Sequence, residues 1–159
     1  MNDTVMPEWM KRMRDEARAA GTRNSAEDQK QQTASFAIKA DGPRFWKELK
    51  EKIAIAVEFL GEAAKLAGSI SGIPGGGIQV KVWRPGISPA QTYTNLAWLP
   101  DRGKINCSTL NGGVWNLQFC FSEENGVGVM DERTGDGPLN PEEAAELIMR
   151  RTMCEVETA

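Results

Sequence analysis

The hydrophobic pattern of this chain changes its period at Ile78, and this change constrains the fold more than any other feature. From Ile78 to Glu132, apolar and polar residues alternate in five runs, which short segments rich in Gly, Pro and Asn separate. Such alternation is typical of half-buried β-strands, and such segments are typical of hairpin turns. The runs cover residues 78–84, 92–99, 104–110, 114–122 and 127–132. Because no helical pattern lies between the runs, the sequence predicts an antiparallel five-stranded meander.

A long helix is predicted before the meander and a shorter one after it. Between residues 42 and 68, apolar residues recur at steps of three and four, and Pro43 fits the first helical position. After the meander, Asn140 and Glu143 have the spacing of a capping box at the start of a second helical pattern. The predicted fold class is therefore α+β, an antiparallel five-stranded β-meander packed by a long N-terminal helix and a shorter C-terminal helix.

Residues 1–40 differ from the rest of the chain in composition. Apolar side chains at helical spacing form one stripe near the N-terminus, namely Met6, Trp9, Met10, Met13, Ala17 and Ala20. Residues 24–40 are polar and Gln-rich, which is typical of a mobile linker or a marginal helix. We therefore expect residues 1–40 to form an amphipathic arm helix plus a polar linker. Residues 41–159 are expected to form a single domain with one helix, five strands and one helix.

The stretch GIPGGG, from Gly72 to Gly77, raises the question of a phosphate-binding loop. Loops of the Walker type place Lys and Ser or Thr after the glycines and before a helix, and dinucleotide-binding loops run from a strand into a helix. Here the glycines follow a helical pattern, precede a strand and lack the Lys-Ser/Thr pair. The sequence favours a hinge between the helix and the sheet.

The register of the third and fourth strands is predictable from their patterns. In residues 114–122 the aromatic side chains occupy odd positions, and in the strand before it the apolar Ile105 and Cys107 do, against Asn106 and Ser108. A three-residue loop, 111–113, pairs odd positions with odd positions and places Cys107 toward the core and Cys120 on the opposite face. One sheet face is thus predicted to be aromatic and covered by the long helix, while the other is polar.

The composition excludes several classes of function. The chain has no histidine, which removes Ser-His-Asp and Cys-His catalysis and every histidine metal site. Its three cysteines match no zinc pattern. For the acidic stretch 131–143, roles in a turn and at a helix N-terminus are favoured over a cation site, because its spacing does not fit a calcium loop. We expect no metal ion and no other cofactor.

Charge and hydropathy narrow the choice of partners and compartment. The net charge of −3 and the pI of about 5.2 disfavour nucleic acid. Residues 1–23 carry only one more basic than acidic side chain, which disfavours a membrane surface. No apolar run approaches the roughly 18 residues of a membrane span, and the first residues lack the apolar core of a secretory signal. We expect a cytoplasmic protein.

The function predicted first is that of a small non-catalytic binding or assembly protein. The expected partner is another polypeptide or a second copy of the chain. One candidate contact surface is the N-terminal stripe, and the other is the open polar sheet face. The residues assigned to these surfaces are Trp9, Met10 and Met13 on the stripe, and Trp83, Asn116 and Gln118 on the sheet.

Two other functions stay open. A small-ligand pocket between the helix and the sheet would be lined by aromatic side chains, with Trp46, Trp98, Trp115 and Phe119 as candidates. A carboxylate-based or thiol-based enzyme is the third interpretation, and it has no assigned catalytic residue.

Overall fold

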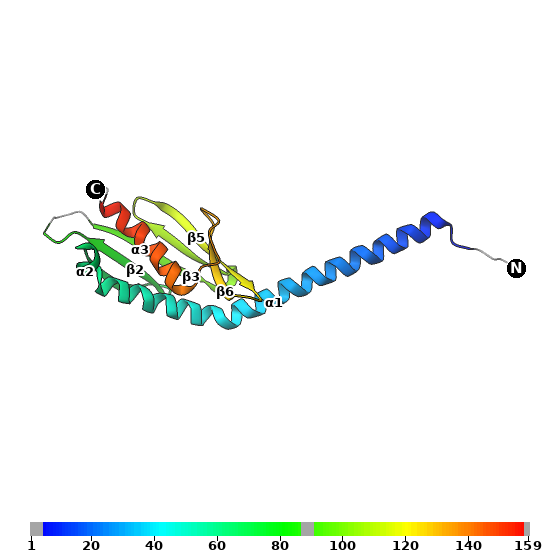
Figure 1. Ribbon diagram of the computed structural model, residues 1–159, viewed down its shortest axis with the longest axis horizontal. Helices are drawn as coiled ribbons and strands as arrows, with labels where there is room; N and C mark the ends of the chain where they lie inside the picture. Colours follow the sequence, from blue (N-terminus) through cyan, green and yellow to red (C-terminus); the bar gives the residue numbers. More distant parts are fainter. Residues whose placement is uncertain (1–4, 87–90, 158–159) are drawn as a thin grey trace. The chain divides into compact units, whose positions relative to one another are not determined.

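The computed structural model describes residues 5–86 and 91–157, with the backbone alone at 20–26 and 155–157. Residues 87–90, which fall between the first two predicted strands, lie outside the described residues. A long N-terminal helix, an antiparallel sheet and a C-terminal helix confirm the predicted α+β class (Figure 1). The chain divides into two units, residues 1–36 and 37–159, and the domain boundary predicted at residue 40 stays a prediction.

Helix α1 spans Glu8–Glu58 and is longer than predicted. The polar stretch 24–40 and Pro43 both lie within it, so the prediction that a helix begins at Pro43 is wrong. Pro43 has no N–H to donate to the carbonyl of Lys39, and Asp41 and Gly42 before it are weak helix formers. Phe45, Trp46 and Leu49 are buried in the core directly after it, and this packing maintains the helix across the gap. Directly after the proline, Arg44 and Glu48 form an ion pair at 3.1 Å, which links residues one helical turn apart.

The helical region ends before the position that the sequence predicts. After α1 the chain forms the short helix α2, Leu60–Ala64, and Lys65 then adopts a left-handed conformation with a φ of 56°. The N–H groups of Lys65 and Leu66 both donate to the carbonyl of Leu60, which terminates the helix. This termination lets the chain enter the sheet at Ala67.

The sheet has six strands rather than the predicted five, because residues 67–73 form an additional one. Strand β1, Ala67–Ile73, pairs antiparallel with β2, Gly77–Trp83, in an unbroken register. Between them lies a tight turn, in which Gly75 and Gly76 have φ values of 91° and 87°. The hinge predicted from GIPGGG is therefore wrong, since this stretch is the turn of a β-hairpin.

The remaining strands follow the predicted meander. They are β3, Gln91–Leu99, β4, Lys104–Thr109, β5, Gly113–Ser122, and β6, Gly126–Asp131. Neighbours in the sequence are neighbours in the sheet, in the order β1 to β6, and every pairing is antiparallel. The alternation in the sequence therefore predicts these strands to within one or two residues.

The register predicted for the third and fourth strands is confirmed in β4 and β5. Cys107 pairs with Trp115, so odd positions face odd positions. The loop has the predicted length of three residues, although it consists of Leu110 to Gly112 rather than 111–113. As predicted, Cys107 is buried, while Cys120, which lies on the other face of the sheet, is only partly buried.

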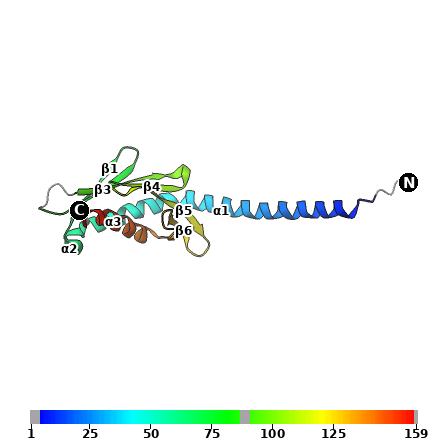
Figure 2. The same cartoon turned by 90° about the horizontal axis from the view of Figure 1, so that it is seen from above.

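The core lies on one face of the sheet, and both long helices cover that face (Figures 1 and 2). Helix α3, Pro141–Glu157, and the part of α1 that follows residue 37 lie on the same side of the strands. Leu49 and Ile53 of α1 and Ile148 of α3 are fully buried there, against alternate residues of β2 to β6. The opposite sheet face has no helix packed on it among the described residues of this unit.

Candidate functional site

The sheet face without a helix carries polar side chains that bond to one another across the strands. Gln79 Nε2 donates to Asn95 Oδ1 at 3.0 Å, and these two residues lie opposite each other on β2 and β3. Asn106 Nδ2 donates to Asn116 Oδ1, also at 3.0 Å, in an opposed pair on β4 and β5. Each amide pair satisfies part of its own hydrogen bonding within the sheet.

The structure places the three sheet residues of the predicted contact surface on this polar face. Trp83, Asn116 and Gln118 are all partly buried and alternate with buried residues on their strands. Gln118 Nε2 donates to the carbonyl of Gly103 at 2.9 Å. Trp83 lies on β2, whereas the two amides lie on β5, with β3 and β4 between them. The three residues therefore share a face but form no single cluster.

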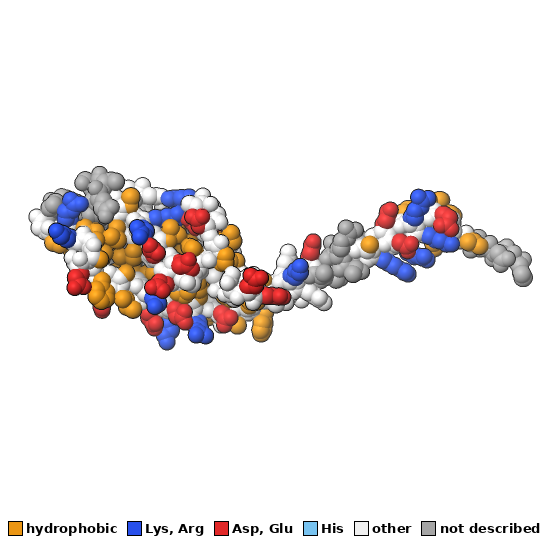
Figure 3. Space-filling view, in the orientation of Figure 1, with side chains coloured by type: hydrophobic (Ala, Val, Ile, Leu, Met, Phe, Trp, Pro, Cys, Tyr) orange, Lys and Arg blue, Asp and Glu red, His pale blue; other side chains and the backbone are white. Residues whose placement is uncertain are grey.

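The predicted N-terminal stripe is exposed at the start of α1. The exposed fractions are 58% for Trp9, 42% for Met10 and 60% for Met13. Val5 and Met6 continue the apolar surface toward the N-terminus. Figure 3 shows hydrophobic side chains among charged ones in this segment. Contiguous large apolar side chains at a surface are typical of interaction sites.

Three of the four aromatic residues predicted to line a ligand pocket are buried in the core. Trp46, Trp115 and Phe119 are each at most 5% exposed, and Trp98 packs against the same cluster. The rings of Phe45 and Phe119 meet edge to face with their centroids 5.3 Å apart. These side chains contribute hydrophobic packing between helix and sheet, and the aromatic ligand pocket stays a prediction.

An apolar groove lies elsewhere, between α1, α2 and α3. Its volume is about 510 Å³, and its lining includes Ala56, Ala64, Ala145, Met149 and Met153. Hydrophobic side chains are visible between charged ones over this part of the molecule in Figure 3. At the rim, Glu146 and Arg150 pair with each other at 2.9 Å. The groove offers apolar contact but few polar groups that would orient a small ligand.

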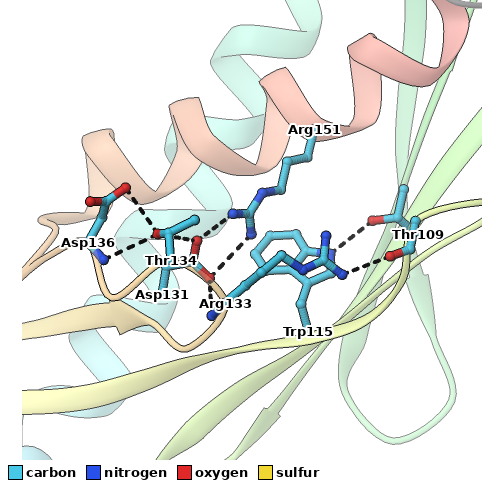
Figure 4. A network of polar contacts seen from close by, with 8 residues as sticks. Thr109, Trp115, Asp131, Arg133, Thr134, Asp136 and Arg151 are labelled. Atoms are coloured by element: carbon cyan, nitrogen blue, oxygen red, sulfur yellow. Dashed lines mark hydrogen bonds and ion pairs between the residues drawn. The ribbon is translucent and has the colours of Figure 1, made fainter.

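A buried ion pair joins β6 to α3 (Figure 4). The carboxylate of Asp131, the last residue of β6, pairs with the guanidinium of Arg151 on α3. The side chain of Asp131 is fully buried, and that of Arg151 is 19% exposed. The guanidinium carbon lies 4.4 Å from the centre of the Trp115 ring, so the cation is also held against an aromatic face.

A chain of hydroxyl groups continues from Trp115 into the core. The indole N–H donates to Thr109 Oγ1 at 3.1 Å, which lies 3.2 Å from Thr94 Oγ1. Thr94 Oγ1 lies 2.6 Å from Thr152 Oγ1, and Thr152 donates to the carbonyl of Ile148 at 2.8 Å. Each hydroxyl can thus donate to the next. No buried side-chain nitrogen or oxygen in the described residues lacks a partner, so this network holds α3 to the sheet and presents no unpaired atom to a ligand.

The surroundings of Asp131 favour its charged form. Burial by itself raises the pKa of this carboxyl, but the Arg151 guanidinium, the Arg133 backbone N–H at 3.1 Å and the Thr134 hydroxyl at 2.9 Å all donate to it. Together these donors hold the pKa of Asp131 below its ordinary value. A carboxylate that stays ionised and fully paired is poorly suited to general acid or base catalysis near neutral pH.

The acidic stretch 131–143 takes structural roles in the structure. Asn140 and Glu143 form the predicted capping box, with the Glu143 N–H donating to Asn140 Oδ1 at 2.8 Å and the Asn140 N–H donating to Glu143 Oε1 at 3.1 Å. The Asp136 N–H donates to Thr134 Oγ1 at 3.2 Å, and Asp136 Oδ2 lies 3.0 Å from the same hydroxyl oxygen. Within the described residues, no group of three or more Cys, Asp or Glu side chains is arranged to hold a metal ion.

The cysteines differ in their surroundings. Burial raises the pKa of Cys107 far above the ordinary range of a thiol. Burial also raises the pKa of Cys120, and a hydrogen bond from the backbone of Gly128 offsets only part of this effect. Because the thiolate is the reactive form, the raised pKa values make both residues less reactive than an ordinary thiol near neutral pH. Cys154 is exposed on α3, and none of the three forms a disulfide.

Sequence reasoning did not pair Asp131 with Arg151, although a signal was present. Asp131 follows Val127 and Val129 at steps of two, so it shares their inward side of β6. A carboxylate that points into a core requires a counter-charge. Arg151 lies three residues after Ile148, on the buried side of α3, and is therefore the candidate partner.

No protein-family model matches this chain, and no curated protein and no solved structure matches it either. Among the helices of the described residues, none has the length and apolar character needed to cross a lipid bilayer.

Proposed function

We propose that this protein is a small non-catalytic binding or assembly protein of the cytoplasm, and that its N-terminal stripe contacts a second copy of the chain. The observation that carries the proposal is the exposure of Trp9, Met10 and Met13, at 58%, 42% and 60%. Full burial of one such side chain stabilises a complex by about 1.5–3 kcal/mol. Three neighbouring side chains therefore supply a substantial driving force for association.

The charges around the stripe fit a protein partner better than a lipid or nucleic-acid surface. Residues 5–19 carry four basic and three acidic side chains, which are mixed along the segment. Glu8 and Lys11 lie 3.6 Å apart, and Arg14 and Asp15 lie 3.7 Å apart. Mixed charges of this kind form complementary pairs with a second helix, whereas binding to phosphate groups favours a net positive segment.

The polar sheet face receives less support as the contact surface. Its amide side chains already bond to one another, as in the pairs Gln79–Asn95 and Asn106–Asn116. A partner would have to replace these hydrogen bonds with equivalent ones, which yields little net free energy. The apolar stripe has no such competing interaction.

Light scattering of the full chain tests the proposal. The molar mass is measured across a range of protein concentrations for the unchanged chain and for the double variant Trp9→Gln/Met13→Gln. The matched control is Arg12→Gln/Asp15→Gln, which makes the same substitutions in the same turns of the helix. Glutamine is a strong helix former, so both variants retain the helix.

The proposal expects the stripe variant to weaken self-association at least tenfold, an effect of about 1.4 kcal/mol, and the control, which removes only exposed charges, to weaken it less than about threefold. Circular dichroism verifies that the two variants have equal helix content. Equal association of the two variants, or a chain that remains at 17.5 kDa at every concentration, would rule out the stripe as a contact between copies.

A further inference from the structure

The two edges of the sheet differ in how their backbone groups are satisfied. At the β6 edge, the Val129 N–H donates to the Leu139 carbonyl at 3.1 Å, and the Leu139 N–H donates back at 2.7 Å. The Asp131 N–H donates to the carbonyl of Asp136 at 2.9 Å. The segment 136–139 therefore covers this edge at Val129 and Asp131. It occupies the positions that another strand would need.

The β1 edge has no such cover. Among the described residues, the backbone of β1 makes hydrogen bonds only to β2 and within the turn that follows, where the Gly76 N–H donates to the Ile73 carbonyl at 3.3 Å. Alternate N–H and C=O groups of an edge strand point away from the sheet. Within the described residues, the outward-facing groups of β1 thus have no backbone partner.

The sequence of β1 also lacks the devices that usually protect an edge strand. Natural edges carry Lys, Pro or a bulge, or are very short. The seven residues of β1, AGSISGI, include no charge and no proline, and each pairs with a single residue of β2 without a bulge. An edge that is regular, uncharged and open is suited to pairing with another strand.

We propose that β1 pairs with the β1 strand of a second copy of this chain, antiparallel and across a two-fold axis at Ile70. The two sheets then form one continuous sheet. In this register Ile70 faces Ile70 of the second copy, and Ser69 faces Ser71 of the second copy. Both serines are exposed and lie on the polar sheet face, where their hydroxyl groups can bond across the strands.

A second copy fits this edge better than an unrelated extended peptide. Peptides that add to a sheet edge gain specificity from pockets that receive alternate side chains. Gly68, Ser69, Ser71 and Gly72 form no such pockets, but two identical strands of small residues can approach closely without a clash or a like charge. Because residues 136–139 already bond to β6, β1 is the open edge within the described residues, and pairing of identical edges stops at two copies.

Two variants of the full chain test the register directly. Ser69→Glu/Ser71→Lys places a carboxylate at position 69 of one copy opposite an ammonium group at position 71 of the other, twice across the axis, and these pairs attract. Ser69→Glu/Ser71→Glu places like charges at the same two positions. Both variants introduce the same carboxylate at position 69, next to Lys81 of β2, so this internal contact is equal in the two. Both positions are exposed, and thermal unfolding verifies that the variants are equally stable.

The unchanged chain and Ser69→Glu/Ser71→Lys are expected to reach twice the monomer mass of 17.5 kDa. Ser69→Glu/Ser71→Glu is expected to dissociate with a constant about tenfold higher or more than that of its counterpart. Equal dissociation constants for the two variants would overturn the proposal. Hydrogen exchange gives a second readout, since the amides of residues 67–73 should become more protected as the protein concentration rises.

This inference does not depend on the N-terminal stripe. If Trp9→Gln/Met13→Gln associates like its control while the two β1 variants differ, the β1 pairing stands and the proposed function fails. If the stripe variant weakens association and the two β1 variants have equal dissociation constants, the proposed function stands and the β1 pairing fails. The two outcomes are distinguished by variants that share no residue.

Discussion

Asp131 at the end of β6 and Arg151 on α3 form an ion pair in which the carboxylate is fully buried and the guanidinium rests against the ring of Trp115. The pair links the last strand to the last helix on the covered face of the sheet. A buried pair adds little beyond what a well-packed apolar pair would give, but removal of one partner leaves a charge without compensation. Its contribution is therefore measured by breaking it.

We predict that Asp131→Asn lowers the free energy of unfolding by about 3 kcal/mol near neutral pH. The amide keeps the shape of the carboxyl but leaves the Arg151 cation in a site that is only 19% exposed. Urea unfolding followed by circular dichroism measures the loss. The control is Asp136→Asn, an exposed residue of the same turn that bonds to Thr134, where a loss below about 1 kcal/mol is expected. Equal losses would show that the ion pair is not the cause.

The same variant shows how the contribution of Asp131 to the stability of the fold depends on pH. Because the pKa of Asp131 is lowered in the folded protein, its stabilising effect is complete above the ordinary carboxyl pKa of about 4. The effect is lost as the pH falls through the lower folded-state value. The difference in melting temperature between the unchanged chain and Asp131→Asn should thus be largest from about pH 6 to 7 and shrink below about pH 4. A constant difference over this range contradicts the assignment.

Two glycines of β1 should respond differently to alanine. A β-carbon at Gly68 would lie 2.5 Å from Leu60 Cδ1 and 2.9 Å from the carbonyl oxygen of Lys81, and the second atom belongs to the backbone of the paired strand. We expect Gly68→Ala to lower the free energy of unfolding by about 1–3 kcal/mol. Gly72→Ala, on the same face of the strand with nothing within 4 Å, should change it by less than about 0.5 kcal/mol. Chemical denaturation of both variants measures the two values.

The three thiols should react with a thiol reagent in a fixed order. Cys154 is exposed and is expected to react first, followed by Cys120, whose pKa burial raises. Cys107 is fully buried with a raised pKa and should react only when the protein unfolds. Mass spectrometry of the labelled protein after increasing times gives the order. Labelling of Cys107 in the folded protein at the rate of Cys120 would contradict the structure.

Strands β2 to β6 were predictable because each presents one face to the core and the other to a polar surface. In β5, Trp115, Leu117 and Phe119 alternate with Asn116 and Gln118. This alternation predicts both the presence of the strand and its register. The same signal gives the inward position of Asp131. The alternation does not identify the partner of Asp131, because Arg151 is separated from Asp131 by a turn and most of a helix.

Strand β1 was not predictable because its own residues carry almost no pattern. Gly and Ser have low strand propensity, and only Ile70 and Ile73 are large and apolar. The preceding alanines continue the helical period, so the helix is predicted to extend as far as Gly68. The strand forms because β2 offers it a paired edge. The chain reaches this edge through the left-handed turn at Lys65, which is a tertiary effect that a local pattern does not contain.

The position of α3 after the sheet has a consequence for synthesis on the ribosome. Helix α1 emerges first and can cover part of the apolar face as the strands follow, but Arg151 and Thr152 are made only after all six strands. Until then the carboxylate of Asp131 has no cation, and the hydroxyl chain that starts at Trp115 ends at Thr94. A chain whose translation stalls before Arg151 would therefore carry an incomplete core, which marks it for proteolysis rather than release as a stable fragment.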